Sequence, residues 1–209
     1  MSSDDRAGPV SRGGLWTAPL LAAAGAIAAL LLVPRRARAR TRVARMRPPA
    51  PPAIYDLRRY PPRSSEAVVL FTSAARFAGL PDAWASAPEL HAILEKESGG
   101  YVGRPNYQFG AFARVDQQDR WPEIWTAIQA GTWRALLAEP YRTGPRAAQS
   151  SASGLGQLTS TNIPSYYPSG LAGIGIPLEE AIGMLRYIAA RYGSPERAWA
   201  RYGLGQEGY

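Results

Sequence analysis

The segment from Glu89 to Gly100 carries the acidic side chain best suited to acid–base chemistry. Three apolar residues, Leu90, Ile93 and Leu94, precede Glu97 by seven, four and three positions, so a helix would place all four side chains on one face. A carboxyl group in the last helical turn, beside an apolar face and near the negative end of the helix dipole, is predicted to have a raised pKa. Such a group suits general acid catalysis near neutral pH. The alternative is a glutamate that only satisfies backbone groups at the helix end.

The residues around Glu97, and the composition of the chain, narrow the chemistry further. Glu95 is expected to point away from the apolar face, and His91 lies one position off that face, which indicates a surface or boundary position. His91 is the one histidine, and there are no cysteines, so a disulfide framework and thiolate metal sites are excluded. A histidine metal cluster and a Ser-His-Asp hydrolase are not expected, and no metal or cofactor is predicted.

A second motif follows at Ser151-Ala-Ser-Gly-Leu-Gly-Gln-Leu-Thr159. Together with Glu97-Ser98-Gly99, it resembles the paired signature of the soluble lytic transglycosylase family. The family's Glu-Ser pair corresponds to Glu97 and Ser98, and its Gly-Leu-Met-Gln element to the four residues from Gly154 to Gln157, with glycine in place of methionine. The resemblance covers residues 86 to 203 and includes a similar order of helices.

This resemblance implies a lysozyme-like fold that cleaves the glycan strands of peptidoglycan between N-acetylmuramic acid and N-acetylglucosamine. Glu97 would protonate the glycosidic oxygen and then act as a base, while the sugar's own C6 hydroxyl closes on C1 to give a 1,6-anhydro product. The amide of Gln157 is able to donate and to accept, which fits an N-acetyl group or a sugar hydroxyl. The predicted substrate-binding residues are Ser98, Tyr107, Ser151, Gly154, Gln157 and Tyr202.

The chain departs from the family pattern in two places. More than fifty residues separate Glu97 from Gly154, and this insertion is a candidate roof for a glycan groove. The family's late Tyr-Asn-Ala-Gly motif appears as Tyr202-Gly-Leu-Gly205, so its asparagine is missing. A structural protein of a virion or envelope that binds glycan without cutting it is therefore one alternative function.

Another alternative is a hydrolytic muramidase on the same fold, which would need a second carboxyl group. Asp116, Asp119 and Glu123 are the candidates, and their charged surroundings favour a solvated surface instead. The anhydro-forming reaction needs no protein nucleophile, which agrees with the absence of an obvious second catalytic carboxylate near either motif.

The hydrophobic pattern predicts a mainly α-helical domain over residues 65–209, of lysozyme-like α+β type with little β structure. Irregular or minor β structure is expected between residues 101 and 120. Glycine and proline mark the helix ends. The predicted helices are 66–78 before Gly79, 88–99, 121–131 with Trp121, Ile124, Trp125 and Ile128 buried, 177–193 with Leu178, Ile182, Leu185 and Ile188 buried, and a last one from Pro195 that carries Trp199 and Tyr202.

An N-terminal membrane anchor is predicted ahead of this domain. After a tail over residues 1–14, residues 15–33 are uncharged and about as long as the roughly 20 residues that cross a bilayer as a helix. Seven arginines between Arg35 and Arg47 account for most of the net charge of +8, and residues 34–64 form an arginine-rich and proline-rich linker. A cleaved signal peptide is less consistent, because its positive charge would precede the apolar stretch.

The arginine run has three interpretations: binding of anionic lipid, binding of packaged DNA, or a topology signal alone. The positive-inside rule places the arginine-rich side in the cytoplasm, whereas peptidoglycan lies outside the inner membrane. Two localisations would resolve this conflict for a single-pass protein. One is the internal membrane of a phage virion, with the enzyme acting during genome entry, and the other is a bacterial inner membrane with the domain facing the wall.

Overall fold

A computed structural model describes residues 57–142 and 149–203. They form six α-helices and five short 3₁₀ helices (η) and contain no β-strand, which confirms the prediction of a mainly α-helical domain. In chain order these are α1 Ser65–Ala78, η1 Asp82–Ser86, α2 Pro88–Glu97, η2 Tyr107–Ala113, η3 Val115–Arg120, α3 Trp121–Gln129, η4 Trp133–Leu136, α4 Ile163–Tyr166, η5 Gly170–Gly173, α5 Pro177–Arg191 and α6 Pro195–Gly203.

The predicted membrane span (15–33) and the arginine run lie outside the described residues. Within the described ranges, the helices are too short or too polar to cross a membrane. The expected minor β structure between 101 and 120 reduces to single bridges at Tyr101 and Pro105, followed by the helices η2 and η3.

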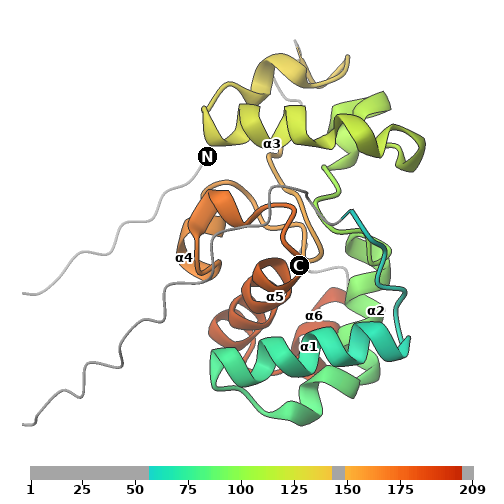
Figure 1. The fold of residues 1–209 in the computed structure, drawn as a ribbon, viewed down its shortest axis with the longest axis vertical. Coiled ribbons are helices and arrows are strands. Elements are labelled where there is room, and N and C mark those ends of the chain that lie inside the picture. Colours follow the sequence, from blue (N-terminus) through green and yellow to red (C-terminus); the bar gives the residue numbers. More distant parts are fainter. Residues whose placement is uncertain (1–56, 143–148, 204–209) are drawn as a thin grey trace, which may run out of the picture. The chain divides into compact units, whose positions relative to one another are not determined.

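Apolar faces bring the helices together around one core. Helix α1 packs along α5 (Figure 1), and α4 also contacts α5. Helix α2 packs against α6. Helix α1 begins where the hydroxyl of Ser64 accepts a hydrogen bond from the Ala67 N–H, and it ends at Gly79, whose φ of 69° favours glycine. These two ends fix the length of the helix that supports α5.

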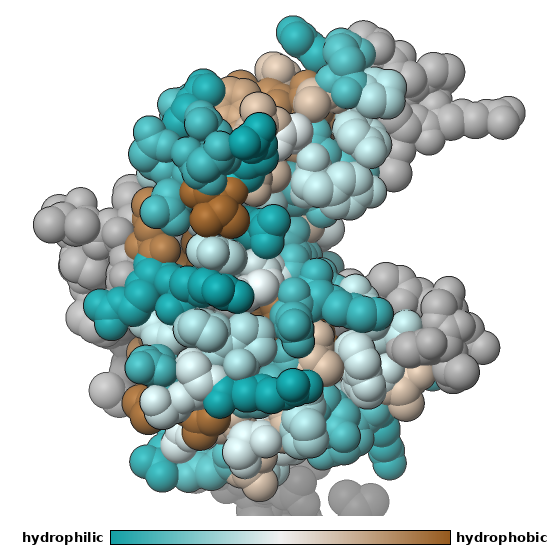
Figure 2. Space-filling model, turned by 90° about the vertical axis from the view of Figure 1, so that its right-hand side faces the viewer, coloured by the Kyte–Doolittle hydropathy of each residue, from teal (hydrophilic) through white to brown (hydrophobic). Residues whose placement is uncertain are grey.

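The predicted helical periodicity is confirmed at most positions. The four predicted residues on α3 are buried: Trp121, Ile124, Trp125 and Ile128. Leu90, Ile93 and Leu94 on α2 are buried as well. On α5, Leu178 is 39% exposed, so the prediction of a buried Leu178 is wrong. The buried side of this first turn carries Glu179 and Glu180 instead. Figure 2 shows one face of the molecule, where hydrophilic side chains predominate and hydrophobic ones occur in small groups.

The prediction of a surface or boundary His91 is also wrong, since this side chain is only 2% exposed. Its Nδ1 accepts a hydrogen bond from the Arg63 N–H at 3.0 Å, and its Nε2 lies 2.9 Å from the Ala85 carbonyl. The ring also packs edge-on against Phe71 of α1. These partners occupy both ring nitrogens, so His91 is a structural residue of the core where α1, η1 and α2 meet.

Residues 57–64, which the sequence pattern assigns to the linker, pack on this domain. The Tyr60 N–H donates to the Gly100 carbonyl at 2.7 Å, and Arg59 forms a bridge with Tyr101. Leu57 and Tyr60 are partly buried against the core. The segment therefore covers the turn that follows α2 and helps to fix the position of that turn.

Candidate functional site

A groove with a volume of about 450 Å³ opens beside the C-terminal end of α2. Its lining comes from the end of α2, the segment around η2, the turn at Gln157 and helix α6. The lining residues are Lys96, Glu97, Arg104, Pro105, Asn106, Tyr107, Gly110, Ala113, Arg114, Gln157 and Tyr202. Among the described residues of this lining, Glu97 is the one acid, and Lys96, Arg104 and Arg114 are basic.

Glu97 is half-buried at the end of α2, and this burial raises the pKa of its carboxyl group to about 7. Two neighbours oppose the shift: a hydrogen bond from the Tyr202 hydroxyl and the positive charge of Lys96 both lower the Glu97 pKa. The predicted raised pKa is therefore confirmed, with desolvation as its main cause. Near neutral pH the group is present both as an acid and as a carboxylate, which general acid–base catalysis requires.

Tyr202 comes to Glu97 from the last helix. Its burial, followed by the charge of Glu97, raises the pKa of its phenol to about 12, so the hydroxyl stays protonated and remains a donor. The Tyr202 ring stacks on Trp199 with 5.8 Å between centroids, and the Lys96 ammonium lies 4.7 Å from the Tyr202 ring centre. These contacts hold α6 against the end of α2.

The structure places Ser98 in the interior and outside the groove lining. Its side chain is fully buried and donates to the Leu155 carbonyl at 3.0 Å, while the Gly100 N–H donates to its hydroxyl. Ser98 thus joins the end of α2 to the turn of the second motif. In this arrangement it positions Glu97 relative to that turn, and it has no path to a sugar.

Glu180, on the first turn of α5, is the centre of a second buried network. It accepts hydrogen bonds from the N–H groups of Gly103 at 2.9 Å, Leu155 at 2.9 Å and Gly175 at 2.7 Å. Burial raises its pKa to about 7, although the three backbone donors oppose this shift. One carboxyl group therefore ties three loops together beneath the groove. A Cβ on Gly154 would lie 2.7 Å from its carboxyl carbon, which explains the glycine at that position.

Gln157 has the strained backbone that a non-glycine residue adopts rarely, with φ at 46°. Its side-chain amide donates to the carbonyls of Arg104 at 2.7 Å and Gly154 at 3.1 Å. Both amide hydrogens are therefore directed at the protein. The amide oxygen is left as the group that Gln157 presents, and it suits an N–H donor such as that of an N-acetyl group.

The insertion between the two motifs forms one wall of the groove. Asn106 caps η2 by accepting the Gln108 N–H at 3.0 Å, and its own N–H donates to the Ala152 carbonyl at 2.9 Å. Tyr107 follows with 68% of its surface exposed, its ring edge-on to Tyr141 at 5.9 Å. The insertion thus supplies an exposed aromatic ring at the groove edge.

Helix α3 anchors this wall to the rest of the domain. The Trp125 indole N–H donates to the Gly103 carbonyl at 2.7 Å. A Cβ on Gly103 or on Gly175 would collide with the same indole ring. The tryptophan is therefore fitted between the two loops that Glu180 also binds.

Of the predicted substrate-binding residues, the structure brings Tyr107, Gln157 and Tyr202 together with Glu97 in the groove. Gly154 and Ser151 are buried behind the lining, where the Ser151 hydroxyl bonds to that of Ser160 at 2.7 Å. Their contribution is to shape the turn that carries Gln157.

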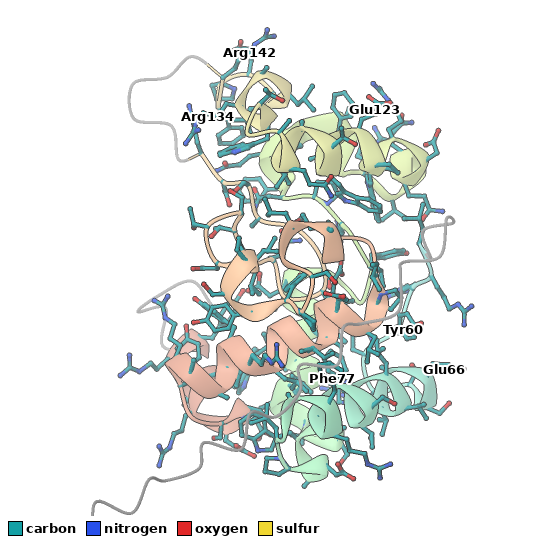
Figure 3. The ribbon with its side chains drawn as sticks, turned by 60° about the vertical axis from the view of Figure 1, so that its left-hand side comes forward. Tyr60, Glu66, Phe77, Glu123, Arg134 and Arg142 are labelled. Carbon is teal, nitrogen blue, oxygen red and sulfur yellow. The ribbon has the colours of Figure 1, made fainter. Side chains whose placement is uncertain are left out.

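The three candidates for a second carboxyl group are exposed and lie outside the groove lining. Asp116 pairs with Arg114 at 2.7 Å, and Glu123, which Figure 3 labels on α3, lies 3.4 Å from Arg120. Their interpretation as surface residues agrees with this placement. In the described ranges, moreover, there is no group of three or more histidine, cysteine or acidic residues that would hold a metal.

Sequence reasoning did not identify Lys96, Arg104, Arg114 or Glu180 as parts of the site. The three cations come from different elements, and no spacing in the sequence connects them. Glu180 follows Pro177 in a first helical turn, where an acidic residue is ordinarily explained by the helix dipole. Its burial depends on loops distant in sequence, so the signal lies in tertiary structure.

Comparisons of this chain with protein-family models, with curated proteins and with solved structures find no match.

Proposed function

We propose that this domain is a peptidoglycan lytic transglycosylase of lysozyme-like type, with Glu97 as its single catalytic acid and base. The observation that carries the proposal is a half-buried glutamate, with a pKa of about 7, as the one acid in the lining of a groove. A glutamine amide and an exposed tyrosine ring in the same groove, at Gln157 and Tyr107, fit a substrate of N-acetylated sugars.

In the proposed reaction the protonated Glu97 gives its proton to the glycosidic oxygen as the C1–O bond breaks. The C6 hydroxyl of the same muramic acid attacks C1, and its proton returns to the Glu97 carboxylate. Bond formation and bond cleavage balance, and no water is consumed. Tyr202 holds the carboxyl group in place by its hydrogen bond throughout.

A hydrolytic muramidase is less well supported, because two carboxyl groups normally flank the bond that a glycosidase cleaves. Among the described lining residues, Glu97 has no acidic neighbour. A domain that only binds glycan would not need a carboxyl group held near its titration point in the groove, so the pKa of Glu97 supports an enzyme over a binder.

For the whole chain we propose a single-pass protein anchored through residues 15–33, in a phage virion's internal membrane or in a bacterial inner membrane. The Arg35–Arg47 run would then contact anionic lipid or packaged DNA. The substrate in either case is the peptidoglycan that the domain meets.

The products of digestion distinguish these functions. The full-length chain, kept in detergent, is incubated with purified peptidoglycan, and the released muropeptides are weighed by mass spectrometry. Anhydro ends, one water lighter than hydrolysed ends, are expected. Release of reducing ends would identify a hydrolytic muramidase instead. Peptidoglycan that stays intact would identify a domain that only binds glycan.

A further inference from the structure

The lining of the groove carries more positive charge than a neutral glycan requires. Lys96, Arg104 and Arg114 line it, and Glu97, its one acid, is largely protonated below a pH of about 7. The sugar backbone of an N-acetylated glycan is uncharged, so this excess of positive charge is not required to bind the rings themselves. It calls for an anionic substituent on the substrate.

Arg104 is the cation that the structure prepares best. Its side chain is partly buried, one guanidinium nitrogen donates to the Ser98 carbonyl at 3.0 Å, and the guanidinium lies 5.8 Å from the Tyr101 ring centre. The Arg104 carbonyl is also fixed, by the Gly154 N–H and by the Gln157 amide. The guanidinium of Arg104 is therefore held by the first motif, and its backbone carbonyl is held by the second.

Arg104 nevertheless forms no ion pair with any described carboxylate. Arg114 differs, because it binds Asp116 through two hydrogen bonds of 3.0 and 2.7 Å. Lys96 also differs, since its ammonium lies over the rings of Trp199 and Tyr202 and its charge acts on Glu97. A partly buried, pre-oriented guanidinium without a carboxylate partner is suited to receive one from a ligand.

We infer that Arg104 binds a carboxylate carried by the muramic acid residue of the substrate, and that the groove therefore selects muramyl glycans over uncharged chitin-type glycans. This inference rests on the proposed function for its substrate class. The shared chemistry is a carboxylate close to the sugar, and it has two sources: the stem peptide, or the lactyl group itself once the peptide has been removed.

Binding to the full-length Glu97→Gln chain tests the inference without turnover. Three ligands of equal sugar number are titrated calorimetrically: a muramyl tetrasaccharide with its peptides, the same sugar stripped of peptides by an amidase, and chitotetraose. Either muramyl ligand is expected to bind about tenfold more tightly than chitotetraose, the equivalent of one charge-assisted hydrogen bond. The lactyl carboxyl group is an amide in the peptide-bearing ligand, so an advantage of that ligand assigns the carboxylate to the stem peptide. An advantage of the stripped ligand alone assigns it to the lactyl carboxylate that the amidase frees.

Adding Arg104→Gln is expected to remove this advantage, so that all three ligands bind with similar affinity, while Arg104→Lys restores part of it. The matched control is Arg134→Gln, because Arg134 points outward over the Trp133 ring and lies outside the groove lining. Figure 3 labels this arginine, which belongs to η4. Equal affinity of the Glu97→Gln chain for all three ligands, or an advantage that survives Arg104→Gln, would overturn the inference. Failure of the wild-type chain to cut peptidoglycan would instead overturn the proposed function.

Discussion

The Tyr202 hydroxyl donates a hydrogen bond to the carboxyl group of Glu97, and this bond joins the last helix of the domain to the end of α2. It stabilises the carboxylate form and so limits how far burial raises the Glu97 pKa. The balance between the two effects places the pKa at about 7.

The balance predicts how activity depends on pH. Because protonated Glu97 is the form that starts the reaction, kcat/KM should fall as pH rises through about 7. Tyr202→Phe removes an interaction that lowers the Glu97 pKa, so this descending limb should move about one pH unit higher, as the loss of a hydrogen bond to a charged group implies. The measurement is release of muropeptides against pH. Tyr166→Phe is the control, since Tyr166 lies outside the groove lining, and a limb that stays in place in Tyr202→Phe would disprove the coupling.

The raised pKa of Glu97 also predicts that Glu97→Gln stabilises the domain by an amount that depends on pH. Folding raises the Glu97 pKa from 4.5 to about 7, so the folded state holds a proton that the unfolded state loses within this window. Wild-type stability from this group is thus present at pH below 4.5 and declines as pH rises to 7. The free energy of unfolding of Glu97→Gln, relative to wild type, should increase by about 3 kcal/mol across the window, because each pKa unit corresponds to about 1.4 kcal/mol.

Denaturant unfolding followed by tryptophan fluorescence, at pH values of about 4 and 8, measures this difference. Glu95→Gln, at an exposed position on the same helix, is the matched control variant. A constant difference between Glu97→Gln and wild type would mean that the Glu97 carboxyl group is not desolvated.

The glycine of the second motif offers a test of the buried network around Glu180. Gly154 and Gly131 both have positive φ, at 80° and 72°, so alanine strains the backbone at either position by about 1 kcal/mol. Only at Gly154 would the new Cβ meet a neighbour, the Glu180 carboxyl group at 2.7 Å. Gly154→Ala should therefore lower the unfolding free energy by about 2 kcal/mol more than Gly131→Ala, in the range typical of overpacking. Equal losses of stability would show that the hydrogen-bond network of Glu180 accommodates the added methyl group without cost.

Ser98 separates a positioning role from substrate binding. Ser98→Ala removes the hydroxyl that donates to the buried Leu155 carbonyl, so the domain should lose about 1–3 kcal/mol of stability. The exposed Ser73 on α1 provides the control Ser73→Ala, which should cost little. A rise in KM at unchanged melting temperature would instead favour direct contact between Ser98 and the glycan.

Helix identity and the acid at the end of α2 were predictable, because both follow from local spacing. Leu90, Ile93 and Leu94 define a buried face, and the position of Glu97 on that face implies its raised pKa. The buried His91 was not predictable in this way, since its burial depends on α1 and on the Arg63 backbone packing over it.

The groove itself depended on contacts between distant segments. Arg104 reaches the site through a turn fixed by Gly154 and Gln157, which lie about fifty residues later in the chain. The exposed ring of Tyr107 and the loops held by Glu180 have the same origin. Periodicity finds the faces of helices, and it does not show which loops those faces bring together.

Paired digestion of purified peptidoglycan shows whether the Glu97 carboxyl group cleaves glycan. Wild type, Glu97→Gln and Glu95→Gln are compared as full-length chains, and all three must show the same circular dichroism. We expect wild type and Glu95→Gln to release muropeptides with anhydro ends at similar rates, and Glu97→Gln to release at least about a hundredfold less, as the loss of a general acid implies. Release by Glu97→Gln at the wild-type rate would show that this carboxyl group is not the catalyst.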